Sequence, residues 1–123
     1  MKPPIILRDK QAGDAMVFES VDDVLSYVES VDVQDGVYEV FDSDGRLLEF
    51  EILEDHKEPG KRQHRLDNLP MALRAAETSP RHAAEVKRHL TDTLVLSGES
   101  ESKLRSLSLE ELVGLARSIL RPR

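Results

Sequence analysis

Residues 36–55 read GVYEVFDSDGRLLEFEILED and have the pattern of a β-hairpin. Two runs of β-branched, aromatic and leucine residues flank Ser43 to Gly45, and a short loop that ends in Gly is a common hairpin turn. A loop of these three residues, with the glycine in the left-handed conformation, places Asp42 opposite Arg46. A shorter loop would bring Glu39 onto the apolar face, so we predict the longer one.

This register gives the hairpin two different faces, because successive side chains of a strand point to opposite sides. One side is uniformly apolar and holds the cross-strand pairs Tyr38–Phe50 and Val40–Leu48. The other side is mostly acidic and holds Glu39, Glu49 and Glu51, with Phe41 and Leu47 paired beside the turn. We therefore expect the hairpin to have a core face and a solvent face.

The segments before the hairpin predict a strand and a helix. Residues 16–19 are short and β-prone, and Ser20 is a helix cap with Asp23 in the capping-box position. The helix is expected from about Val21 to Ser30 because apolar residues recur on one of its faces. Residues 1–14 contain two prolines, a glycine and several charges, and we expect them to form a flexible arm.

Residues 69–121 predict a helical part after the hairpin. Asn68 with Pro70, Ser79 with Pro80, and Ser108 with Glu111 are helix-start patterns. The fold class expected is α+β: a small antiparallel β-hairpin plus one extra strand, packed against an N-terminal helix and a C-terminal group of about three helices. Residues 15–123 then form one domain, with residues 15–55 as an acidic strand-helix-hairpin unit. The expected core includes Tyr38, Val40, Leu48, Phe50, Val24, Leu25, Val28, Val86, Leu90, Leu112 and Ile119.

Charge is distributed unevenly along the chain. Residues 1–55 contain 15 Asp and Glu against 4 Lys and Arg, whereas residues 56–123 contain 9 against 13, within a net charge of −7. An acidic field attracts basic surfaces and accelerates association with them. Acidity also favours solubility, and composition leaves both interpretations open.

Several classes of site are not expected. The chain has no cysteine, which excludes disulfides and thiolate chemistry and fits the reducing cytoplasm. No apolar run is long enough for a membrane span, so we expect a cytoplasmic protein. No Gly-x-Ser-x-Gly elbow or glycine-rich phosphate loop is present, and we predict a protein that is not an enzyme and needs no cofactor.

Metal binding is not expected either. The hairpin loop matches part of the EF-hand template, but Val40 occupies the first ligand position and the flanks are strand-like. His82 and His89 lie two helical turns apart, too far to share a metal without ligands from elsewhere. We expect these histidines, with His56 and His64, to be exposed.

The segment Phe18–Phe50 resembles small cytosolic immunity proteins of bacterial polymorphic toxin systems, of the Rhs-type or contact-dependent kind. The shared features are a short strand, an acidic capped helix that begins S-V-x-D, and the run D-V-x-x-G-x-Y-x-V-F-D-x-x-G-R-x-L. The resemblance implies a protein without catalytic residues that neutralises one cognate toxin by tight binding.

We predict that the cognate toxin domain is basic and is held by an acidic surface. The expected partner-binding residues are Asp22, Asp23, Glu29, Asp32, Asp35, Glu39, Glu49 and Glu51, with Phe41 and Leu47 as apolar anchors. The alternative is a nucleic-acid-binding or regulatory module that uses the basic loop 56–65 and the C-terminal helices. The acidic remainder of the chain and the lack of aromatics in that loop make nucleic acid the weaker alternative.

Overall fold

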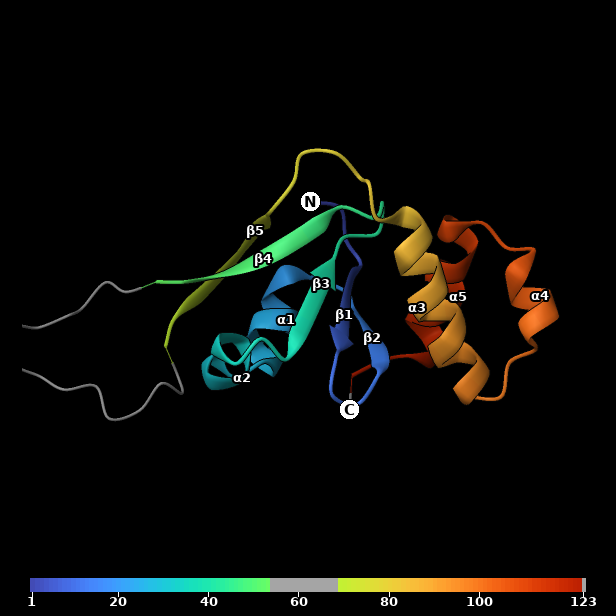
Figure 1. Cartoon of the computed structure of the whole chain (residues 1–123), viewed down its shortest axis with the longest axis horizontal. Helices are drawn as coiled ribbons and strands as arrows, with labels where there is room; N and C mark the ends of the chain where they lie inside the picture. The colour runs from blue at the N-terminus through green and yellow to red at the C-terminus, as the bar shows by residue number, and fades with distance from the viewer. Residues whose placement is uncertain (54–68, 123) are drawn as a thin grey trace, which may run out of the picture.

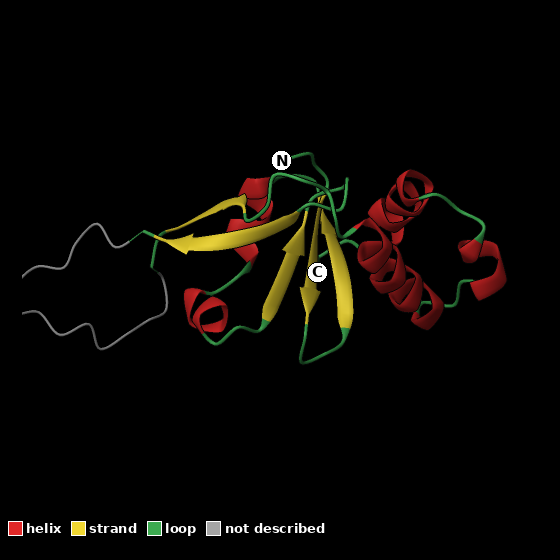
Figure 2. Ribbon diagram, turned by 45° about the horizontal axis from the view of Figure 1, so that its top comes forward, coloured by secondary structure: helices red, strands yellow, loops and turns green. Residues whose placement is uncertain are grey.

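An antiparallel sheet of five strands forms the middle layer of the molecule, and helices cover both of its faces (Figures 1 and 2). The structure is a computed structural model that describes residues 1–53 and 69–122. The strands are β1 (Ile5–Asp9), β2 (Asp14–Phe18), β3 (Tyr38–Phe41), β4 (Leu47–Ile52) and β5 (Met71–Ala75), in the order β2-β1-β3-β4-β5. The helices are α1 (Val21–Tyr27), α2 (Ser30–Gln34), α3 (Ala83–Leu96), α4 (Glu101–Arg105) and α5 (Leu109–Ile119). The fold is therefore α+β.

Strand β1 is buried in the sheet, which corrects the expected flexible arm over residues 1–14. It pairs with β2 on one side and with β3 on the other. Ile5, Ile6 and Leu7 are all 0 % exposed, because this run faces apolar layers on both sides of the sheet. Ile5 and Leu7 pack with residues of α1, and Ile6 packs with residues of α3 and α5.

The β3–β4 hairpin has the predicted turn. Val40 pairs with Leu48, the Asp42 amide donates to the Arg46 carbonyl at 3.0 Å, and Gly45 has a φ of +90°. Tyr38 and Phe50 are partly buried against the same cluster as Val40 and Leu48, so the predicted core face is confirmed.

The other face of the hairpin does not face solvent near the turn, because α3 covers it. The His82 amide donates to the Gly45 carbonyl at 2.9 Å. A Cβ atom on Gly45 would lie 2.5 Å from the backbone of Ala83, so only glycine allows this approach. The contact places the start of α3 directly over the hairpin loop.

Two further predictions are wrong. Residues 71–75 were expected to be helical but form β5, which pairs with β4 from Leu48↔Ala75 to Ile52↔Met71. Pairing with a neighbouring strand overrides the helix propensity of this Met-Ala-Leu-Arg sequence. The sheet therefore contains β1 and β5 in addition to the expected hairpin and extra strand. The second wrong prediction concerns Ile119, which was expected in the core but is 37 % exposed.

Two of the predicted helix caps are confirmed, but the start at Ser79 and Pro80 is wrong, because α3 begins at Ala83 with His82 at its N-cap. Ser108 and Glu111 form a reciprocal capping box at α5, with both hydrogen bonds at 3.1 Å. Ser20 caps α1 through the Asp23 amide, also at 3.1 Å. Helix α1 ends at Tyr27, and a separate helix α2 follows where a single helix was expected to reach Ser30. No helix in the described part of the chain is long and apolar enough to cross a membrane.

Candidate functional site

The predicted acidic surface divides into two groups on opposite faces of the sheet. Glu39, Glu49 and Glu51 alternate along β3 and β4 with residues that pack against α1, so they lie on the face away from α1. The other acidic residues lie on and beside α1 and α2. One continuous patch, as the sequence suggested, is therefore not formed.

Arginines neutralise the three strand glutamates. Arg8 on β1 bonds to Glu39 at 2.8 Å, and the two residues face each other in the strand register. Arg74 on β5 bonds to Glu49 at 2.7 Å and lies 4.0 Å from Glu51. These glutamates are thus partly or wholly balanced within the sheet.

The helical carboxylates have no such partners among the described residues, and we call them the acidic face. The acidic face consists of Asp22, Asp23, Glu29, Asp32 and Asp35. In the described ranges, no Lys, Arg or His nitrogen lies within 4.0 Å of any of their carboxylate oxygens. The sequence accounts for this, because residues 11–45 contain no Lys or Arg at all.

Two tyrosines lie at the α2 end of the acidic face. Tyr27 is 41 % exposed, and its ring packs against Phe18 with 5.2 Å between centroids. Burial raises the pKa of Tyr38 to about 12, and the nearby charges of Asp32, Tyr27, Asp9 and Glu29 add to this shift. The Tyr38 hydroxyl therefore stays protonated within the field of these carboxylates. Sequence reasoning missed both tyrosines, although Tyr27 falls outside the apolar stripe of its helix.

One of the two expected apolar anchors, Phe41, is wrong. Phe41 is 0 % exposed and packs with residues of α3 and α5, with its ring 5.9 Å from His82 and 6.2 Å from His89. Leu47 is partly buried against the same cluster. Phe41 is therefore a core residue and cannot contact a partner in the folded protein.

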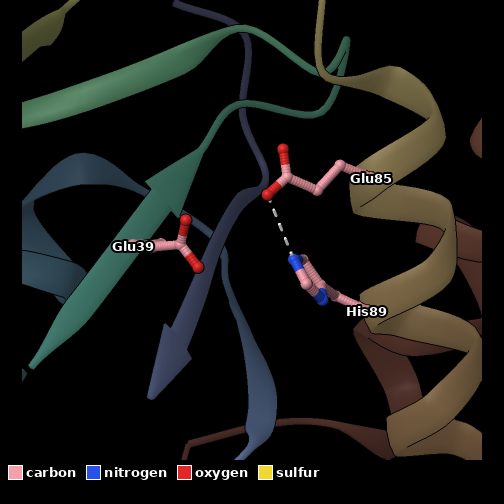
Figure 3. A group of neighbouring side chains, drawn as sticks. All are labelled: Glu39, Glu85 and His89. Carbon is pink, nitrogen blue, oxygen red and sulfur yellow. Dashed lines mark ion pairs between the residues drawn. The ribbon is translucent and has the colours of Figure 1, made fainter. Parts of the chain in front are cut away.

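A second polar group lies between β3 and α3 (Figure 3). Glu39 from β3 and Glu85 and His89 from α3 each offer one ligand atom, and these three atoms all lie within 4.8 Å of one another. The Glu85 Oε1 and His89 Nε2 atoms are 3.5 Å apart. His89 was expected to be exposed, but it is 8 % exposed, and its buried Nε2 has no hydrogen-bond partner within the described residues. Burial lowers the pKa of His89, and the charge of Arg8 lowers it further.

His82 connects this group to the surface. Its Nδ1 lies 2.8 Å from Glu85 Oε2, and its Nε2 lies 3.2 Å from Glu77 Oε1. These hydrogen bonds raise the pKa of His82, with Glu85 as the larger cause. The same bonds lower the pKa of Glu85 and of Glu77, so both glutamates stay ionised. The side chain of Glu85 is held in place by His82.

A groove of about 620 Å³ lies between the N-terminal residues, the hairpin loop and the start of α5. The charged groups in its lining include Lys2 and Asp44, which are 3.5 Å apart, and Arg117, which bonds to Glu19 at 2.6 Å. These three charges are already paired, whereas Glu110, which also lines the groove, forms no ion pair within the described residues.

The basic loop 56–65, with His56 and His64, lies outside the described residues. Comparison of the chain with protein families, with curated proteins and with solved structures finds no match. The interpretation of function therefore starts from the acidic face and from the group between β3 and α3.

Proposed function

We propose that this protein binds and neutralises a basic toxin domain, and that the acidic face on α1 and α2 makes the contact. The observation that carries the proposal is that, within residues 1–53 and 69–122, no Lys, Arg or His side chain forms an ion pair with these five carboxylates. Asp22, Asp23 and Asp32 lie in the first turns of α1 and α2, where the helix dipole favours a negative charge. Repulsion among the five like charges nevertheless opposes folding. A basic partner would remove that repulsion.

The acidic face suits fast recognition of a positively charged surface. Complementary charges steer two proteins together and raise the association rate, and the effect weakens as salt screens the charges. Tyr27 adds an exposed aromatic ring that rests on Phe18, and rigid aromatic side chains are frequent energetic centres of interfaces. The proposed contact therefore combines charged residues with one aromatic anchor.

The resemblance to immunity proteins supports a toxin as the class of partner. The resembling segment, Phe18–Phe50, spans α1, α2 and the β3–β4 hairpin, and so contains the whole acidic face. Immunity proteins act by binding, which agrees with a candidate surface that carries charge and no catalytic group.

Reversing three charges of the acidic face tests the proposal. We expect a variant with Glu29, Asp32 and Asp35 changed to Lys to associate at least about tenfold more slowly with the cognate basic toxin domain. The reason is that the reversed charges repel the basic surface that the native carboxylates attract. Association and dissociation rates are measured by surface plasmon resonance at low and physiological salt.

A matched control distinguishes the effect of reversing charges on the acidic face from the effect of changing the net charge. Asp92, Glu99 and Glu110 lie on or beside α3 and α5, and within the described residues none of them forms an ion pair. Their change to Lys alters the net charge equally. The control is expected to keep most of the association rate. Equal losses in the two folded variants would show that no particular face makes the contact and would refute the proposal.

A further inference from the structure

We infer that Glu39, Glu85 and His89 form a binding site for a divalent transition-metal ion of the zinc type between β3 and α3 (Figure 3). The inference is independent of the acidic face, since Glu39 lies on the opposite side of the sheet from α1. It rests on three observations: the convergence of the ligand atoms, the unsatisfied histidine nitrogen, and the way each carboxylate is held.

The histidine nitrogen is the first sign of a missing ligand. His89 is 8 % exposed, and its Nε2 is buried without a hydrogen-bond partner among the described residues. Buried polar atoms in folded proteins almost always have a partner, and an exception needs a physical reason. This nitrogen faces Glu85 in Figure 3, at 3.5 Å from the carboxylate oxygen. A metal ion bound between the two residues would satisfy it.

Each carboxylate is held by one oxygen and offers the other. Arg8 binds Oε1 of Glu39 at 2.8 Å, which leaves Oε2 for a ligand. His82 binds Oε2 of Glu85 at 2.8 Å, which leaves Oε1 facing His89. Hydrogen bonds of this kind orient the ligands of metal sites and strengthen binding. Arg8 and His82 are therefore positioning residues for the proposed site.

The donor set and spacing favour zinc over harder cations. One imidazole nitrogen with two carboxylate oxygens suits Zn²⁺ or a similar transition metal, whereas Mg²⁺ and Ca²⁺ prefer oxygen ligands alone. Zinc binds such atoms at about 2.0–2.2 Å, so tetrahedral ligands lie roughly 3.4 Å apart. The Glu85–His89 spacing of 3.5 Å already fits this geometry. The Glu39 atom lies within 4.8 Å of the other two, so its spacing has to shorten by at most roughly 1.4 Å, from 4.8 Å to about 3.4 Å, to match this geometry. Three protein ligands would leave one position for water.

Calorimetric titration of the metal-free full chain with ZnCl₂ tests the inference. We expect one ion per chain with a dissociation constant on the order of 1 μM. Glu39→Gln is expected to weaken binding at least about tenfold, because an amide is a poorer zinc ligand than a carboxylate. Glu49→Gln is the matched control, since it changes a glutamate on the same face of the sheet outside the cluster, and it should leave the affinity unchanged.

Cobalt provides a readout that does not depend on stability. Co²⁺ in place of Zn²⁺ is expected to give visible absorption bands typical of tetrahedral coordination in the wild-type chain and in Glu49→Gln. The bands should be lost in Glu39→Gln and in His89→Gln. Absence of stoichiometric zinc binding, or zinc binding and cobalt bands that survive in both cluster variants, would overturn the inference.

Discussion

Replacing Phe41 by Ala should lower the free energy of unfolding by about 3–5 kcal/mol, the cost typical of removing a fully buried aromatic ring. Phe41 is 0 % exposed and lies in the cluster that joins the sheet to α3 and α5. Its ring also contacts those of His82 and His89. Truncation would therefore leave a cavity in the layer that holds the helices on the sheet.

Phe50→Ala is the informative comparison for this experiment. Phe50 is only partly buried against the α1 side, so we expect a loss of about 1–2 kcal/mol. Glu49→Ala should change stability by less than about 0.5 kcal/mol, because its bond to Arg74 is largely exposed. Urea unfolding followed by circular dichroism measures all three variants. A larger loss for Phe50 than for Phe41 would mean that α3 and α5 do not cover this face.

Asp42→Ala should cost about 3 kcal/mol, because it removes a buried charge from the hairpin turn. Asp42 is 0 % exposed. Its Oδ1 accepts from the amides of Asp44 and Arg46 at 3.0 and 2.9 Å. Its Oδ2 accepts from the Lys2 amide at 3.2 Å and from the Arg46 guanidinium at 2.7 Å. The substitution leaves these donors without their acceptor.

Asp44→Ala is the control for the loss of a negative charge from the same loop. Asp44 is exposed and lies 3.5 Å from Lys2, so the expected effect is below about 0.5 kcal/mol. Thermal and urea unfolding of both variants provide the measurement. If the two substitutions had similar effects, the hydrogen bonds of Asp42 would not stabilise the turn as described.

Local patterns predicted the hairpin turn and the caps at Ser20 and Ser108, because their geometry depends on neighbouring residues. The turn before Arg46 and the capping box at Ser108 are both set within a few residues of sequence. Strand β1 was missed because prolines and charges surround its apolar run, and its partner β3 lies far along the chain. The strand β5 was missed because its residues favour a helix until β4 pairs with them.

The acidic site could be predicted only in part. Sequence identifies the carboxylates, but it does not show which of them have internal partners. Arg8 and Glu39 are separated by 31 residues, and Arg74 and Glu49 by 25, so only the folded sheet brings them together. For the same reason the spacing of histidines along α3 could not reveal Glu39, the member of the proposed metal site that comes from β3.

Hydrogen exchange of the protein alone and in complex with the proposed toxin domain is the most direct test of the acidic face as the interface. We expect amides in residues 21–35, which include α1 and α2, to exchange more slowly in the complex than in the free protein. Amides of β5 and α5 should keep their free-state rates. Slower exchange in α5 and in the hairpin loop beside it, with unchanged exchange rates in residues 21–35, would contradict the proposed interface. It would place the interface at the groove instead.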